Sequence, residues 1–218
     1  MNKGPSDLKQ YFSAKLKEHG PTARGVDWSS EQRQDICFRQ LIRIMENPLA
    51  KRLDFTPSIL DYGCGYGALA EWLAATEIRF SRYQGFDFTP SMIEHAKLLF
   101  GSLENVKFTD RGAEVEPADF VIGSGLLALK LDARKLEWEE YVFSLIKQMW
   151  SYAHKGLAFN SLTSYSDSDR MRPDLYYPNP AHLFDFCKQN LSRNVAILHD
   201  YGLYEFTILV RRDEEVAL

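Results

Sequence analysis

A glycine-rich stretch, DYGCGYG at residues 61–67, carries the clearest chemical signal in this chain. It follows an apolar run and precedes a helical pattern, so it lies where a strand passes into a helix. Glycines there let the backbone turn sharply and let a ligand lie directly against the main chain. Asp87 stands about 20 residues further on, at the end of the next expected strand, where a carboxylate can accept hydrogen bonds from ribose hydroxyls. The spacing predicts a cofactor that contains a nucleoside.

Two kinds of cofactor fit this pattern. Gly63, Gly65 and Ala68 satisfy the loose fingerprint of a dinucleotide site, with Asp87 at the expected distance. A dinucleotide, however, brings a negative pyrophosphate to the turn, and Asp61 would repel it. S-adenosylmethionine has no phosphate and carries a cationic sulfonium and an ammonium, which suit that carboxylate. We therefore expect S-adenosylmethionine as the cofactor, and a nicotinamide-dependent oxidoreductase remains the alternative prediction.

The elements that must position these residues alternate from residue 58 onward. The expected strands are 58–63, 82–88, 106–110, 118–125, 156–162, 195–201 and 204–212. The expected helices between them are 66–75, 91–100, 136–154 and 180–191. This alternation predicts an α/β fold, a three-layer αβα sandwich around a seven-stranded, mostly parallel sheet. No helix separates the last two strands, which should form an antiparallel C-terminal hairpin with a tight turn at Gly202.

Residues 1–50 are expected to form an N-terminal helical extension, and residues 51–218 the catalytic domain. One helix is predicted over 7–19, and a second from Ser29-Ser30-Glu31 to near Asn47-Pro48. Two interpretations stay open. The extension is a lid over the cofactor, in which Tyr11 reaches the site, or it is a packing segment that covers a sheet edge or forms a homodimer.

Composition limits the partners and the location. The chain has 218 residues, enough for one domain, and its formal net charge of −4 argues against nucleic acid. Its 3 cysteines form no CxxC pair, so we expect reduced thiols, no metal site and a cytoplasmic protein. No apolar segment approaches the length that spans a bilayer, so no membrane partner is expected.

Over roughly residues 55–212 the sequence resembles the class I S-adenosylmethionine-dependent methyltransferases. LDYGCGYG looks like the first motif of that family, YQGFDFTPSMIEHAK like the second and ADFVIGSGLL like the fourth. The family fold, a seven-stranded sheet whose last strand is antiparallel, agrees with the predicted hairpin. The Asn/Asp-Pro-Pro-Tyr motif of amino-group methylators of DNA and protein is absent after strand four, where the chain has GSGLL.

The resemblance implies a role for each motif residue. Asp87 would hold the ribose, Phe88 would lie beside the adenine, and Asp110 would face the adenine amino group. The methionine part would lie against the glycine-rich stretch. The expected cofactor-binding residues are Asp61, Gly63, Cys64, Gly65, Gly67, Asp87, Phe88, Asp110 and Tyr11.

The acceptor is expected to be a small molecule, aromatic or carboxylated, methylated on oxygen or nitrogen. The loop from 160 to 180 is long for a connection in a compact domain. Arg172 suits an acidic acceptor and Tyr176 and Tyr177 suit a planar one, so we expect this loop to form a wall of the acceptor pocket. His199 and Tyr165 are weak catalytic candidates, and a non-catalytic module that keeps the cofactor pocket is a third hypothesis.

Overall fold

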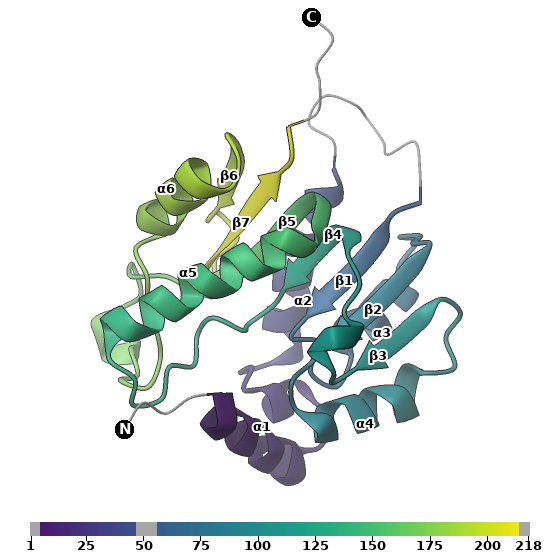
Figure 1. The fold of residues 1–218 in the computed structure, drawn as a ribbon. Helices are drawn as coiled ribbons and strands as arrows, with labels where there is room; N and C mark the ends of the chain where they lie inside the picture. Colours follow the sequence, from purple (N-terminus) through teal and green to yellow (C-terminus); the bar gives the residue numbers. More distant parts are fainter. Residues whose placement is uncertain (1–4, 47–55, 214–218) are drawn as a thin grey trace, which may run out of the picture.

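A seven-stranded sheet runs through the middle of the structure, with helices on both of its faces (Figure 1). The computed structural model describes residues 5–46 and 56–213. The strand order is β3-β2-β1-β4-β5-β7-β6. The strands are β1 Ser58–Tyr62, β2 Arg82–Phe86, β3 Val106–Thr109, β4 Ala118–Gly123, β5 Ala153–Leu162, β6 Asn194–Leu198 and β7 Glu205–Arg211. The predicted α/β sandwich is confirmed.

The pairing of the strands places a ligand site at one edge of the sheet. β1 pairs in parallel with β2 on one side and with β4 on the other, so the strand order reverses there. In open α/β sheets, ligands bind outside the carboxyl ends of the strands at such a point. β7 is antiparallel to both β5 and β6, which confirms the predicted C-terminal pair. The connection between β6 and β7 is longer than the predicted tight turn at Gly202, because β6 already ends at Leu198. Within this connection, the Tyr201 hydroxyl is hydrogen-bonded to the Thr207 hydroxyl.

The helices cover both faces of the sheet. Successive residues of β1 point to opposite faces of the sheet. Ile59 therefore packs in the apolar cluster beneath α2, α3 and α4, whereas Leu60 packs in the cluster beneath α5 and α6. The helices are α1 Pro5–His19, α2 Glu31–Leu41, α3 Ala68–Ala74, α4 Pro90–Phe100, α5 Lys135–Tyr152 and α6 Pro180–Asn190. Short 3₁₀ turns lie at Ala23–Val26, Ile42–Met45, Gly112–Glu114 and Ser168–Arg170.

The N-terminal segment packs against the catalytic fold. α1 lies beside α4 (Figure 1), and its Leu8 and Leu16 are buried in opposite apolar clusters. The second predicted helix is shorter than expected, because α2 ends at Leu41 and continues as a 3₁₀ turn. Its predicted end at Asn47-Pro48 lies outside the described residues.

Close packing beneath the glycine-rich stretch generates a test of stability. A Cβ added at Gly85 of β2 would lie 2.5 Å from the Phe108 ring and 2.9 Å from the Cys64 sulfur. Gly85→Ala should therefore lower the free energy of unfolding by about 1–3 kcal/mol, measured by urea denaturation. Gly112→Ala is the matched control, since no atom lies within 4 Å of its added Cβ. Equal stability of the two variants would contradict the packing described here.

Candidate functional site

The glycine-rich stretch forms a turn from β1 to α3 that is bonded to the end of β2. Gly63, Gly65 and Gly67 have φ angles of 82°, 54° and 93°, a left-handed conformation that favours glycine. The backbone N–H groups of Gly63 and Cys64 both donate to the carbonyl oxygen of Phe86, at 2.7 and 3.0 Å. The turn therefore exposes its main chain beside the carboxyl end of β2.

Two buried carboxylates flank this turn. Asp61, at the end of β1, is only 2% exposed and accepts a 2.6 Å hydrogen bond from the Tyr83 hydroxyl. Burial, and then the charge of Asp87, raise the pKa of Asp61 to about 7. Asp87 accepts hydrogen bonds from the backbone N–H groups of Gly65 (3.0 Å) and Thr89 (2.8 Å), and burial raises its pKa. Two acids so close together attract a cationic ligand.

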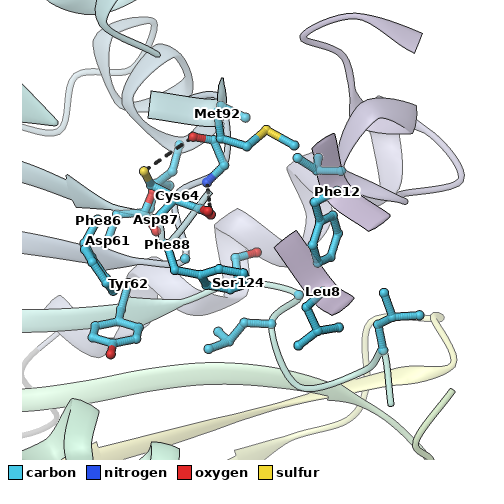
Figure 2. A pocket seen from close by; sticks show the side chains of 18 of the residues that line it. Leu8, Phe12, Asp61, Tyr62, Cys64, Phe86, Asp87, Phe88, Met92 and Ser124 are labelled. Atoms are coloured by element: carbon cyan, nitrogen blue, oxygen red, sulfur yellow. Dashed lines mark hydrogen bonds between the residues drawn. The ribbon is translucent and has the colours of Figure 1, made fainter. Parts of the chain in front are cut away.

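Both carboxylates face a cavity of about 320 Å³, here called the first cavity. Figure 2 shows Leu8 and Phe12 entering it from α1, across from Asp87 and Phe88. Among the described residues its wall carries no Lys, Arg or His. The Ser124 hydroxyl on this wall is buried without a hydrogen-bond partner in the described structure. Further lining residues are Val26, Trp28, Gln34, Phe38, Met92, Gly125, Leu129, Tyr141 and Gln148.

The structure brings most of the expected cofactor residues onto this wall. They are Asp61, Gly63, Cys64, Gly65, Asp87 and Phe88. Burial raises the pKa of the Cys64 thiol well above its usual range, so this residue shapes the turn and does not act as a nucleophile. Gly67 lies behind the wall as the N-cap of α3. Asp110 and Tyr11 are not among the residues that line the first cavity.

A second cavity, of about 290 Å³, adjoins the first and shares Phe12, Val26, Trp28, Gly125 and Leu129 with it. Three arginines and several aromatic side chains reach it. Its other lining residues include Asp27, Ser29, Arg33, Asn160, Ser161, Ser166, Arg170, Arg172, Tyr177, Tyr204 and Glu205. The two cavities together offer room for a cofactor and for an acceptor that meets it.

The loop after β5 contributes to the second cavity, but not as predicted in every position. Arg172 and Tyr177 line it. Tyr176 does not, because its side chain is 1% exposed and packs in the core, where its hydroxyl donates to Glu139 at 2.8 Å. Leu175 forms an isolated β-bridge with Leu129, and the side chain of the next residue, Tyr176, points into the core.

The two catalytic candidates lie away from both cavities. Tyr165 is 70% exposed, and His199 is exposed at the end of β6. Their rings lie 6.0 Å apart, and neither lines a cavity. The residues that sequence reasoning missed come from the N-terminal helices and from β7. Among these residues, the sequence singles out only Glu205, because it is an acid at the start of a strand whose other residues are mostly apolar.

Asp27 links the N-terminal segment to the loop after β5. It accepts a hydrogen bond from the Tyr11 hydroxyl at 2.9 Å and pairs with Lys15 at 3.2 Å. Arg172 lies 3.8 Å from the same carboxylate, and its backbone N–H donates to the Tyr177 hydroxyl at 3.0 Å. These contacts join both segments at the mouth of the second cavity.

Among residues 5–46 and 56–213, none of the helices combines the length and the hydropathy that a membrane span needs. In the same ranges, no group of three or more His, Cys, Asp or Glu side chains is placed to hold a metal ion.

Comparisons with known proteins agree with the geometry. A family model described as a methyltransferase domain matches residues 59–124. A Mycobacterium tuberculosis H37Rv protein, named "Putative methyltransferase Rv1506c", is 43% identical over 155 residues, which are 71% of this chain and 93% of that protein.

Solved structures share the fold at low sequence identity. Magnesium protoporphyrin IX methyltransferase from Synechocystis PCC 6803, with bound SAH, has a TM-score of 0.66 and 15% identity, covering 96% of this chain and 100% of that one. N-methyltransferase NodS from Bradyrhizobium japonicum WM9, in complex with S-adenosyl-l-homocysteine, has a TM-score of 0.64 and 16% identity, covering 94% and 98%.

The raised pKa of Asp61 predicts how stability depends on pH. The folded protein keeps the Asp61 proton up to about pH 7, while the unfolded chain loses it near the ordinary value of about 4. Stability must then fall as pH rises through this window, because the folded state binds more protons. Asp61→Asn should lessen that fall by a few kcal/mol, of order 1.4 kcal/mol per pKa unit, measured by urea denaturation from about pH 4.5 to 7.5.

Glu116→Gln serves as the control, since this exposed side chain pairs with Arg82 far from the turn. An unchanged pH profile in Asp61→Asn would show that Asp61 is ionised throughout the window.

Proposed function

The chain belongs to the class I S-adenosylmethionine-dependent methyltransferases, and on this premise we propose that it methylates an oxygen or nitrogen atom of a small molecule. The first cavity carries the proposal. Two buried carboxylates flank a bare glycine turn on its wall, and its described lining holds no basic side chain. That wall suits a cation and repels a pyrophosphate, which disfavours a nicotinamide cofactor.

The residues present fit S-adenosylmethionine. Asp87 is placed to accept hydrogen bonds from the ribose hydroxyls, and the half-buried Phe88 ring next to it offers a face for the adenine. Asp61 and the Gly63–Gly65 main chain suit the methionine part, and the unpartnered Ser124 hydroxyl is free to bond a ligand. When bound, S-adenosylmethionine supplies an activated methyl group, so the protein mainly has to align the acceptor and exclude water.

We assign the N-terminal segment the role of a lid. Phe12 lines both cavities from α1, and Lys9 lies over the Phe88 ring at 5.9 Å. The Ser13 and Ser91 hydroxyls are bonded at 3.3 Å, which holds α1 against α4. A helix held by few polar contacts over a ligand cavity can open and close without unfolding the sheet. This arrangement favours the lid over a packing role, although Leu8 and Leu16 also contribute to the core.

The second cavity is the proposed acceptor site. It adjoins the cofactor cavity, and aromatic side chains from α1, the segment after it and the loop after β5 face it. Arg170 and Arg172 suit an acidic group, while Tyr177 and Trp28 suit a planar one. The volume of about 290 Å³ favours a small molecule over a polymer. Turnover with a panel of aromatic and carboxylated metabolites separates an active enzyme from a non-catalytic module.

Cofactor binding tests the proposal directly. The protein should bind S-adenosylhomocysteine in calorimetry and should not bind NAD. Asp87→Ala should weaken S-adenosylhomocysteine binding by about 1–3 kcal/mol, because ribose hydroxyls lose their charged acceptor. Asp110→Ala, the same change just after the neighbouring strand β3, should have less effect, since Asp110 does not line the first cavity.

The melting temperature of each variant without ligand separates a lost contact from a disturbed turn, because Asp87 also bonds Gly65. Wild-type binding of NAD, or equal losses in the two variants, would contradict this assignment of the site.

Loosening the lid should speed cofactor release. Asp27 has a φ of 63°, a left-handed conformation that asparagine tolerates, so Asp27→Asn removes the charge and leaves the backbone in place. Its partners Tyr11, Lys15 and Arg172 lose one shared anion. We expect S-adenosylhomocysteine to dissociate about fivefold faster in stopped-flow measurements, corresponding to roughly 1 kcal/mol.

Asp213→Asn, which breaks a pair with Arg193 at the far end of the sheet, provides the control. Identical dissociation rates in both variants would assign the N-terminal segment a packing role.

A further inference from the structure

A buried carboxylate, Glu205, lies in the wall of the second cavity at the start of β7. It is 7% exposed. One of its oxygens, Oε2, accepts two hydrogen bonds, from Asn160 Nδ2 at 2.7 Å and from the Cys37 thiol at 3.4 Å. The other, Oε1, has only the Arg33 guanidinium at 3.9 Å among the described residues. That distance is too long for a hydrogen bond, so Oε1 keeps its capacity to accept one.

The free oxygen of Glu205 faces a cavity that has room for a ligand. Ser161 also lines this cavity, but it pairs with Phe206 across the strands, so its side chain points to the opposite face of the sheet from Glu205. Buried polar groups nearly always have partners, since an unpaired one costs about 1–3 kcal/mol. The free acceptor on Glu205 indicates a ligand that donates a hydrogen bond to it.

Asn160 connects Glu205 to the wall of the first cavity. Its side-chain nitrogen donates to Glu205, and its side-chain oxygen accepts the backbone N–H of Gly125 at 2.8 Å. Gly125 lines both cavities. A single amide therefore connects the boundary between the cavities to the buried carboxylate. A group bound by Glu205 lies close to that boundary, where methyl transfer has to occur.

The opposite charge lies at the rim. Arg170 is 67% exposed and lies 3.9 Å from Asp167, with its guanidinium over the Tyr204 ring at 5.8 Å. Arg172 is 49% exposed and lies beside it in the loop after β5. The second cavity thus presents the Glu205 carboxylate near Arg33 in its buried part, and at its mouth two arginines that are each paired with an aspartate, Arg170 with Asp167 and Arg172 with Asp174.

We propose that Glu205 binds the hydroxyl or amine of the acceptor that receives the methyl group, while Arg170 and Arg172 bind an acidic group at its other end. This rests on the proposed function and narrows its substrate to a planar acid that carries a hydroxyl or an amine. Charge-assisted hydrogen bonds of this kind orient a small molecule in one direction only. Glu205 then binds the acceptor, and its role is not only to link α2 to β7.

Benzoate and the three positional isomers of hydroxybenzoate are suitable probes. All four carry the acid, and the isomers place a hydroxyl at different distances from it. Calorimetry on protein saturated with S-adenosylhomocysteine gives their dissociation constants. We expect at least one isomer to bind about tenfold more tightly than benzoate, the usual gain of a hydrogen bond to a charged group.

Glu205→Gln should reduce this preference to about twofold or less, because the amide is uncharged and presents a competing N–H. Ser161→Ala should leave it unchanged, because that side chain points to the other face of the sheet. Arg170→Gln should weaken all four probes alike, since each carries the acid. Glu116→Gln, an exposed acid far from the cavity, should change nothing. A purely structural role for Glu205 would lower the melting temperature and leave the hydroxyl preference intact.

Three results would overturn the proposal: no preference for any hydroxybenzoate in the wild type, an intact preference in Glu205→Gln, or no binding of any probe at millimolar concentration. S-adenosylhomocysteine affinity is measured on the same samples. Its loss in the wild type would defeat the proposed function itself, whereas its retention in Glu205→Gln confirms that the variant is folded and confines the result to the acceptor.

Discussion

The hydrogen bonds that join the glycine turn to the end of β2 determine where both cavities lie. Phe86 accepts two backbone N–H groups of the turn through its carbonyl oxygen, and Asp87 accepts a third, from Gly65, through its carboxylate. These bonds hold the turn open in a left-handed conformation beside the point where strand order reverses. Burial raises the pKa of Asp61, and repulsion from the neighbouring Asp87 carboxylate raises it further. A cationic ligand would relieve that repulsion.

The second cavity depends on another set of long-range contacts. Asn160 on β5 and Glu205 on β7 meet because these strands are antiparallel neighbours. The helix α2 packs over them and brings Arg33 and Cys37 to the same carboxylate. The ion pairs of Asp27 with Lys15 and Arg172 join the N-terminal segment to the loop after β5 at the mouth of this cavity. The two cavities therefore share walls, and a change in the N-terminal segment affects both.

Most of the fold and about half of the site could be predicted from the sequence. The strand and helix patterns after residue 58 agree with the observed elements apart from their ends. The sequence predicts that Asp61, Gly63, Gly65 and Asp87 lie together, as they do on the wall of the first cavity, because they follow one another within a single strand–turn–helix–strand unit. Tyr176 and His199 were placed in the site on chemistry alone, and the structure directs one into the core and the other to the surface. Neighbouring positions in a loop differ in direction, which spacing cannot reveal.

The sequence by itself determined the alternation of strands and helices, the turn at Gly63 to Gly67 and the acid that follows it, because backbone preferences and periodicity act over short distances. Only the tertiary structure decided that residues of α1 line the first cavity and that Glu205 contacts Asn160 beside Gly125. Those contacts join residues far apart in the chain. They depend on strand register and on how helices pack against a sheet, and both follow from burial of the whole core.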